Sequence, residues 1–197
     1  MGHRIVCIGR QFGSGGHEIA VRAAEQLGIR VYGQELLQLA CRYGEVPPGL
    51  LARADERATN PYLYQGVYEG NYHVDRGLPT SEVLFALQSH EIRRIARAED
   101  CIFVGRCADR VLQDTGARLL RVFVSAPLEQ RICRKMEQEA LSHFQAKHLV
   151  ERMDRRRRKY YEHYTGQVWG DPRCYDLCLD TGCISIPQAA ELIAARF

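Results

Sequence analysis

Residues 5–20 read IVCIGRQFGSGGHEIA, and no other stretch of the chain is as informative. An apolar run is interrupted by four glycines within eight residues, after which the apolar side chains take helical spacing. Gly13, Gly15 and Gly16 let successive backbone N–H groups converge on an anion, and the helix directs the positive end of its dipole at the same place. The stretch therefore predicts a phosphorylated ligand. The alternative is a glycine-rich turn between a strand and a helix that binds no phosphate.

The loop lacks two residues of the usual phosphate-binding pattern. That pattern places a lysine after the last glycine, to reach the terminal phosphates, and then a hydroxyl that holds Mg²⁺. Here those positions read Gly16, His17 and Glu18. Arg10 is then the nearest permanent positive charge, and Ser14 is the nearest hydroxyl and the candidate metal ligand. The predicted phosphate-binding residues are Arg10, Gly13, Ser14, Gly15, Gly16, His17 and Glu18.

The composition indicates an ordinary globular protein. Of the 197 residues, 46% are apolar and 26% are charged, and a typical length of about 150 residues per domain favours one domain over residues 1–197. The formal net charge of +3 is too small to indicate nucleic acid as a partner. We see neither a signal peptide nor an apolar run that could span a bilayer, so we expect a cytoplasmic protein with free thiols.

Three of the eight cysteines, Cys174, Cys178 and Cys183, raise the question of zinc. No pair with the C-x2-C spacing of zinc ligands accompanies them, and Cys174 and Cys178 flank a segment typical of a strand. We therefore predict packed core cysteines rather than metal ligands.

Short β-type runs alternate with helical patterns along the chain. The predicted strands cover residues 4–9, 29–32, 101–105, 119–125 and 175–180. The predicted helices cover residues 18–27, 81–98, 128–141, 148–163 and 187–195. Such alternation implies a parallel sheet that is covered on both faces. We predict a three-layer α/β fold with about five parallel strands.

Residues 43–80 break this alternation. They hold four prolines, five glycines and a block of tyrosines. A loop of this length inside a compact domain is usually functional. Direct contact with a substrate and an ordered insertion that serves packing or dimerisation both stay open.

Arg106 is a second candidate for anion binding. It follows Gly105 at the end of an apolar strand, so its side chain should emerge at the carboxyl edge of the sheet, where ligands of open α/β sheets bind. Its planar guanidinium suits bidentate phosphate recognition better than a lysine would, and a structural ion pair is the alternative. Asp109 and Arg110 are weaker candidates in the same segment.

Residues 152–159 include six cations. On a helix these charges spread over several faces, and Asp154 could pair with Arg157 or Arg158 at i+3 or i+4. A solvated helix face and a nucleic-acid patch are the alternatives. Because the glycine loop lacks its lysine, we predict that this helix closes over the ligand and supplies cations, as part of a lid-like segment of residues 148–171.

These features together resemble the cytidylate kinase-like family of P-loop nucleoside monophosphate kinases over nearly all of the chain. Residues 5–19 resemble the first strand, P-loop and helix of that family, and Gly105 with Arg106 resembles the Gly-Arg that serves the monophosphate. Residues 121–133 resemble the next strand and helix, the basic helix resembles the arginine-rich lid, and residues 176–181 resemble the final strand and base-proximal loop.

The chain departs from the well-characterised cytidylate kinases at four positions. Gly16 stands where they have the P-loop lysine, and Glu18 stands where they have the hydroxyl. Cys107 replaces an Asp that usually follows the Gly-Arg, and Gly33 replaces another common Asp. The looser kinase-like branch, with the same Arg-Gln-aromatic-Gly-Ser-Gly-Gly loop, is more similar.

The resemblance implies ATP-dependent phosphoryl transfer to a nucleoside monophosphate, cytidylate-like, or to a similar small phosphate acceptor, with ATP and Mg²⁺ as cofactors. Residues 13–16 would hold donor phosphates, Arg106 the acceptor phosphate, and Arg155 and Arg158 the developing charge, with residues 43–80 on the acceptor side. The alternative is a catalytically weak or inactive nucleotide-binding sensor or regulator. We expect neither a membrane nor a nucleic acid as partner, and a homodimer is compatible with the sequence.

Overall fold

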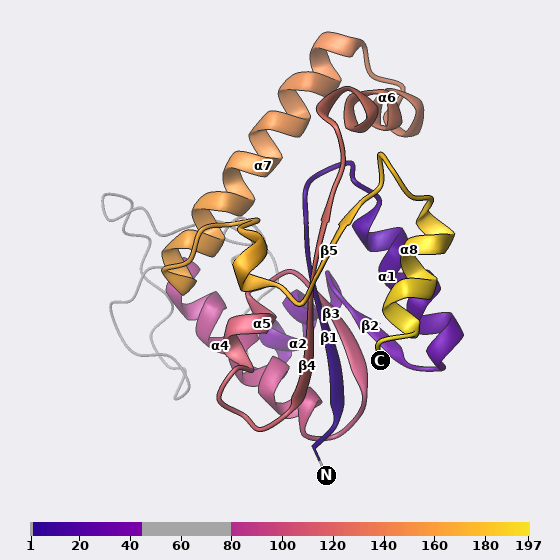
Figure 1. Ribbon diagram of the computed structural model, residues 1–197. Coiled ribbons are helices and arrows are strands. Elements are labelled where there is room, and N and C mark those ends of the chain that lie inside the picture. Colours follow the sequence, from indigo (N-terminus) through magenta and orange to yellow (C-terminus); the bar gives the residue numbers. More distant parts are fainter. Residues whose placement is uncertain (1, 45–79) are drawn as a thin grey trace.

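Five parallel strands form one sheet in the order β2-β3-β1-β4-β5. The computed structural model describes residues 2–44 and 80–197. The strands are β1 (Arg4–Arg10), β2 (Arg30–Tyr32), β3 (Cys101–Val104), β4 (Arg118–Ser125) and β5 (Leu177–Asp180). Because all strands run in the same direction, their carboxyl ends meet at one edge (Figure 1). The predicted α/β fold with a parallel sheet is confirmed.

Strand β1 lies at the centre of the sheet. It pairs with β3 on one side and β4 on the other, so that Ile5 lies opposite Cys101 and Leu119. Its apolar residues Ile5, Val6, Cys7 and Ile8 are at most 3% exposed. Burial on both faces explains why this strand is an uninterrupted apolar run in the sequence.

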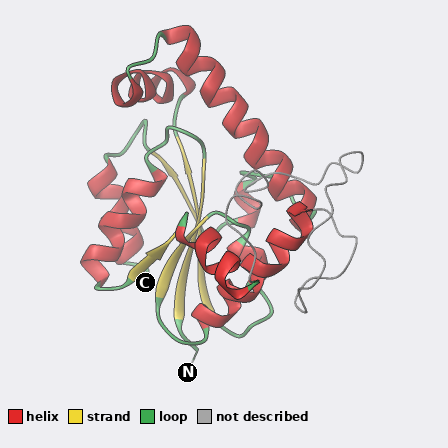
Figure 2. Ribbon diagram, turned by 180° about the vertical axis from the view of Figure 1, so that it is seen from behind, coloured by secondary structure: helices red, strands yellow, loops and turns green. Residues whose placement is uncertain are grey.

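Helices cover both faces of the sheet (Figure 2). These helices are α1 (Gly16–Leu27), α2 (Glu35–Tyr43), α4 (Thr80–Ala96), α5 (Ala108–Val111) and α8 (Ile186–Ala194). Val6 and Ile8 pack with residues of α1 and α8, whereas Ile5 and Cys7 pack with residues of α2, α4 and α5. Alternate residues of one strand thus bind the two helical layers to a single sheet.

Two further helices lie above the carboxyl edge, namely α6 (Leu128–Glu139) and α7 (His143–Thr165) (Figure 1). An apolar cluster of Ile132, Ala146 and Val150 joins them to each other. At the other end of α7, Tyr160 and Tyr161 pack in one cluster with Phe123 of β4. Helix α7 is therefore anchored at both ends over the edge where ligands of such sheets bind.

Some predicted boundaries differ from those in the structure. Helix α7 begins at His143 rather than at residue 148, because Ser142 and Gln145 form a capping box in which each side chain accepts from the backbone N–H of the other. Helices α2 and α5 were not predicted from the sequence. A short 3₁₀ helix, η1 (Pro172–Cys174), precedes β5, which begins at Leu177 rather than at residue 175. Residues 45–79 of the predicted insertion lie outside the described residues.

All eight cysteines are free thiols, as predicted. The expectation of packed core cysteines is wrong for Cys178 and Cys183, which are exposed, while Cys174 is half-buried. Cys178 lies on the edge strand β5, where only Leu179 is buried. No group of three or more metal-ligating side chains forms within residues 2–44 and 80–197. In the same ranges, no helix has the length and apolar character needed to cross a bilayer.

Candidate functional site

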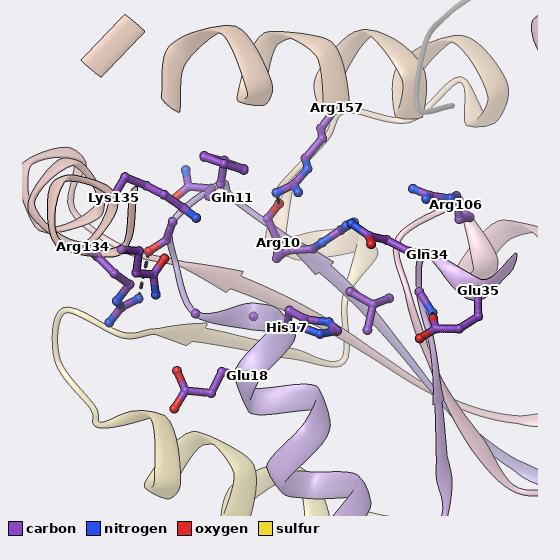
Figure 3. Close-up of a pocket in the computed structure, with 17 residues that line it drawn as sticks. Arg10, Gln11, His17, Glu18, Gln34, Glu35, Arg106, Arg134, Lys135 and Arg157 are labelled. Atoms are coloured by element: carbon purple, nitrogen blue, oxygen red, sulfur yellow. Dashed lines mark hydrogen bonds between the residues drawn. The ribbon is translucent and has the colours of Figure 1, made fainter. Parts of the chain in front are cut away.

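A cavity of about 410 Å³ lies at the carboxyl edge of the sheet, between the glycine loop that follows β1 and the helices α6 and α7 (Figure 3). Of the residues predicted from sequence, its lining includes Arg10, Gly13, Gly15, Gly16, His17, Glu18 and Arg106. The cations of the lining are Arg10, Arg106, Arg134, Lys135 and Arg157, and its carboxylates are Glu18 and Glu35. The structure thus brings an excess of positive charge to the place where the loop N–H groups were expected to bind an anion.

The glycine loop has the backbone that such binding requires. Gly13 and Gly15 have φ values of 80° and 81°, in the left-handed region that side chains other than hydrogen disfavour. Gly15 is the N-cap of α1, and no side chain caps that end. The first-turn N–H groups of a helix need an acceptor, and an anion in the cavity would supply one.

The side chain of Ser14 takes no part in the lining of the cavity. It is fully buried, and its hydroxyl donates to the carbonyl of Gln11 at 2.8 Å. The carbonyl of Ser14 in turn accepts from the hydroxyl of Thr181 at 2.9 Å. In this conformation Ser14 stabilises the loop, and the predicted metal role would require its buried hydroxyl to reach the cavity.

Arg106 reaches the cavity from an unusual backbone. It has a φ of 60° and the next residue, Cys107, has a φ of 54°, both in the left-handed region. Non-glycine residues there cost about 1 to 3 kcal/mol each, and such strain clusters at functional sites. Arg106 is only 4% exposed, and Figure 3 shows its side chain extending toward the part of the cavity that Arg10 occupies.

Helix α7 contributes a different arginine from those predicted. Arg155 and Arg158 do not line the cavity, and the guanidinium of Arg158 lies 5.9 Å from the ring centroid of Trp169. Arg157 lines the cavity instead, and its Nη1 donates to the carbonyl of Arg10 at 3.2 Å. Val150 is buried against α6, and Arg157, seven residues later, lies on the same face of α7.

Asp154 does not form the predicted pair with Arg157 or Arg158. Its carboxylate accepts from Nη1 of Arg131 at 2.5 Å and from the backbone N–H of Phe12 at 2.7 Å. Both side chains of the ion pair are largely buried, at 7% exposed for Arg131 and 15% for Asp154. Around the turns of α7, Asp154 lies nearer to the buried face than to the solvent-exposed face, so its partner is on α6. This pair holds α7, α6 and the glycine loop together.

Helix α6 supplies two cations that the sequence analysis missed. Nη1 of Arg134 donates to the carbonyl of Gly13 at 2.9 Å. Nζ of Lys135 lies 3.0 Å from a carboxylate oxygen of Glu139 and 4.5 Å from the ring centroid of Phe12. With Arg131, these cations stand at i, i+3 and i+4, which is the spacing of one helix face.

The carbonyls of the loop are satisfied by these arginines. Arg131 donates to Phe12, Arg134 to Gly13 and Arg157 to Arg10, at 2.9 to 3.2 Å. The arginines therefore fix the loop from outside through its oxygen atoms. Within the loop, the N–H of Phe12 donates to Asp154 and that of Ser14 to the carbonyl of Gln11, so a ligand would be bound mainly by the N–H groups at the first turn of α1.

Two carboxylates of the lining could take part in holding Mg²⁺. The carboxylate of Glu35 accepts from the N–H of Gly33 at 3.0 Å. Backbone N–H groups of Glu35 and Gly33 lower the pKa of Glu35, with further help from His17 and Arg106, so it is ionised at neutral pH. Glu18 pairs with Arg22 at 3.1 Å on the surface. Mg²⁺ is usually bound by one or two carboxylates and substrate phosphates, so either carboxylate is chemically suited to this ion, although Figure 3 shows them on opposite sides of His17.

A buried polar contact fixes the carboxyl half of α7 behind Arg106. The hydroxyl of Tyr161 donates to the carboxylate of Asp109 at 2.7 Å. Burial raises the pKa of Asp109, whereas the hydrogen bond from Tyr161 lowers it in part. Asp109 therefore serves here as an anchor for Tyr161 next to the strained segment of Arg106.

A parallel sheet, a glycine loop between the first strand and first helix, and a cationic helix pair above the carboxyl edge define a P-loop kinase fold. The model of the cytidylate kinase-like family matches residues 5–182, so the chain belongs to this family. Family and fold together support nucleotide-dependent phosphoryl transfer in general.

Solved structures agree with this assignment. An uncharacterized protein from Eubacterium ventriosum is 26% identical, with a TM-score of 0.72 and coverage of 98% of each chain. A shikimate kinase from Bacteroides thetaiotaomicron is 10% identical, with a TM-score of 0.56 over 100% of this chain and 98% of that chain. An APS kinase from Mycobacterium tuberculosis, solved with AMPPNP and APS, is 19% identical, with a TM-score of 0.53 over 98% of this chain and 96% of that chain. The two kinase likenesses establish the fold alone. No curated protein matches the chain.

Proposed function

We propose that this protein transfers the γ-phosphoryl group of ATP to a small phosphorylated acceptor, with a nucleoside monophosphate as the leading candidate. The observation that carries the proposal is the convergence of the glycine loop, the N-terminal end of α1 and five cationic side chains on one cavity. Donor and acceptor of this reaction are both polyanions, and phosphoryl transfer depends mainly on positioning and charge stabilisation.

In this mechanism the loop N–H groups around residues 13–16 hold the donor phosphates, and Arg106 binds the acceptor phosphate. An acceptor phosphate oxygen forms a bond to the γ-phosphorus while the bond from that phosphorus to the β–γ bridging oxygen breaks, and ADP leaves. The attacking oxygen is already unprotonated on a phosphate dianion, so no general base is needed. Arg157 faces the loop from α7 and would balance charge that develops on the transferred group.

Glu18 or Glu35 would hold Mg²⁺ together with oxygens of the donor. When bound, the ion neutralises charge on the donor phosphates. The chain's own part is to keep the Glu35 carboxylate ionised, which the N–H of Gly33 favours.

A second candidate is a nucleotide-binding sensor or regulator without turnover. It is favoured by the residues at the end of the loop, where Gly16 and Glu18 replace the usual lysine and hydroxyl. Such a protein would bind ATP through the same cavity but would form no product.

The two candidates are separated by one pair of measurements. The purified protein is incubated with ATP, Mg²⁺ and a panel of nucleoside monophosphates, and diphosphate products are quantified by chromatography, while calorimetry reports ATP binding. Product formed by the wild type but not by an Arg106→Ala preparation supports the kinase and excludes a contaminating enzyme. ATP binding without any product supports the sensor. If ATP does not bind at all, both candidates are rejected.

A further inference from the structure

Two positions of the glycine loop have exchanged their residue types relative to the P-loop pattern. In G-x-x-x-x-G-K the first glycine stands six residues before the lysine. With the lysine position at residue 16, the first glycine falls on residue 10. This chain has Arg10 and Gly16 there, so the cation stands where the pattern has glycine, and glycine stands where it has the cation.

The geometry explains why the two changes belong together. A Cβ atom placed on Gly16 would lie 2.6 Å from Cβ of Arg10 and 3.1 Å from its Cγ. Packed atoms do not approach so closely, and Cβ of Arg10 is fixed to the end of β1 and cannot swing away. Only one of the two positions can therefore carry a side chain.

The constraint on Gly16 is one of space alone. Gly13 and Gly15 have positive φ values, so a side chain there would be strained whatever the space, whereas Gly16 lies within α1 with ordinary helical backbone. A lysine at residue 16 would thus be acceptable to the backbone. It is excluded by the side chain of Arg10.

Arg10 is also held where a substitute for the lysine would be needed. Its carbonyl accepts from Nη1 of Arg157 at 3.2 Å, which fixes its backbone beneath α7. Its side chain lines the cavity and, in Figure 3, extends across it between Arg157 and His17. Its side chain ends near Gln34 in this view, so it lies in the same cavity as Gly16 and His17 at the start of α1, the end of the helix from which the P-loop lysine would extend.

We infer that Arg10 has taken over the task of the P-loop lysine, binding the terminal phosphates of a nucleoside triphosphate from the strand side of the loop. This inference rests on the proposed function, because it assigns a role toward the donor of that reaction. A guanidinium can bind two phosphate oxygens at once, so the exchange conserves the charge and changes its geometry.

The test is a reciprocal exchange of the two positions. Three variants are compared with the wild type, namely Arg10→Gly, Gly16→Lys and the double variant that carries both substitutions. Calorimetry gives the Kd for ATP and ADP, and thermal melting reports folding. We expect Arg10→Gly to weaken ATP binding roughly 10- to 100-fold, the range that charge-assisted hydrogen bonds to phosphate imply. Gly16→Lys should lower the melting temperature, because its side chain meets Arg10.

The double variant is the decisive one. With the side chain of Arg10 removed, the lysine introduced by Gly16→Lys has room, and the restored pattern should regain at least about tenfold in ATP affinity over Arg10→Gly. Arg118→Gly is the control, because it removes an exposed arginine at the start of β4, at the opposite edge of the sheet. It should leave the Kd for ATP unchanged.

Two results would overturn the inference while leaving the proposed function in place. One is wild-type ATP affinity in Arg10→Gly, and the other is a double variant that melts like the wild type yet binds no better than Arg10→Gly. If the glycine variants fail to fold, Arg10→Gln and Arg10→Lys decide instead, and equal ATP affinity in the two would reject the role of the charge. If the wild type itself does not bind ATP, the proposed function is rejected.

Discussion

Three consecutive residues at the cavity, Gly105, Arg106 and Cys107, have positive φ values of 80°, 60° and 54°. The N–H of Gly105 donates to the carbonyl of Ile8 at 3.0 Å, so this segment leaves the sheet directly beside β1. Only the first of the three residues is a glycine, and the other two are held in a conformation that is unfavourable for their side chains. Packing offsets this strain, since Arg106 and Cys107 are both buried. The result is a buried arginine that lines the cavity.

Replacing Arg106 with lysine keeps the charge and removes the planar fork. We expect the KM for the acceptor to rise about tenfold, the loss of roughly one charge-assisted hydrogen bond, with little change in melting temperature. Arg121→Lys is the matched control, because Arg121 makes a bidentate pair with Asp176 away from the cavity. Unchanged acceptor binding together with a lower melting temperature would show that Arg106 is a structural residue.

Asp109 provides a prediction on pH. Burial raises its pKa in the folded protein, so between the unfolded value of about 4 and the folded value only the native state keeps the proton. Stability should therefore fall as pH rises through that interval. Asp109→Asn removes the ionisation, and its stability relative to the wild type should increase from about pH 4 toward neutrality. Urea unfolding at a series of pH values measures this, and a difference independent of pH would contradict it.

Helix α7 contributes to the site through one of its faces. Val150, Asp154, Arg157 and Tyr161 follow one another at intervals of four, three and four residues, which places them on one face. That face contacts α6, the glycine loop, the cavity and Asp109 in turn. Arg152, Arg155 and Arg158 are exposed, so one helix can be both a solvated basic surface and a part of the site.

Arg157→Ala and Arg158→Ala compare the structure with the sequence-based prediction directly. A cation that acts on the transition state should lower kcat more than it raises KM. The structure favours Arg157 for this role, with a loss of about tenfold or more in kcat, as expected for a positioned cation, whereas the sequence analysis assigned it to Arg155 and Arg158. Steady-state kinetics of the two single variants show which arginine contributes more to kcat. A larger loss in Arg158→Ala would show that α7 rearranges when substrates bind.

The pair of Asp154 with Arg131 predicts a large effect on folding. Removing one partner of a buried pair typically costs about 3 to 5 kcal/mol, so we expect Asp154→Ala to lower the free energy of unfolding by about 3 kcal/mol. Arg22→Ala removes an exposed pair with Glu18 and should cost less than about 1 kcal/mol. Urea denaturation measures both. Equal losses in the two variants would mean that the Asp154 pair contributes no more than a surface contact.

The same elements show what could be predicted from the sequence. The strands were predictable because residues buried on both faces form apolar runs, as in β1. The glycine loop was predictable because its turn needs positive φ at Gly13 and Gly15. The choice of Arg157 could not be predicted, because it depends on which face α7 turns toward α6. That face becomes known only from the contact of Asp154 with Arg131. The roles of Arg134 and Lys135 likewise depend on where α6 lies over the loop.

Two layers of the protein hold the glycine loop from opposite sides. The sheet and α1 place it from below, and arginines of α6 and α7 bind its carbonyls from above. Positive charge is thereby gathered at one edge of a protein with a formal net charge of only +3. A polyanionic ligand bound there would contact both layers, so its binding should stabilise the fold as a unit.

Ligand-dependent melting tests this arrangement. At a free ATP concentration of about 100 times Kd, binding adds about 2.7 kcal/mol, which for a chain of this size raises the melting temperature by about 5 to 11 °C. Because the loop and its cations recognise phosphates, we expect the shift to decrease in the order ATP, ADP, AMP when these are compared at equal concentration with Mg²⁺, and adenosine to give almost none. The shift with ATP should also decrease when the salt concentration rises from about 0.05 to 0.5 M, because salt screens charge interactions at an open cavity. Differential scanning fluorimetry can measure the series in one experiment. An adenosine shift as large as that of ATP would mean that the protein binds the base rather than the phosphates, and the cationic cavity would then have to serve another ligand.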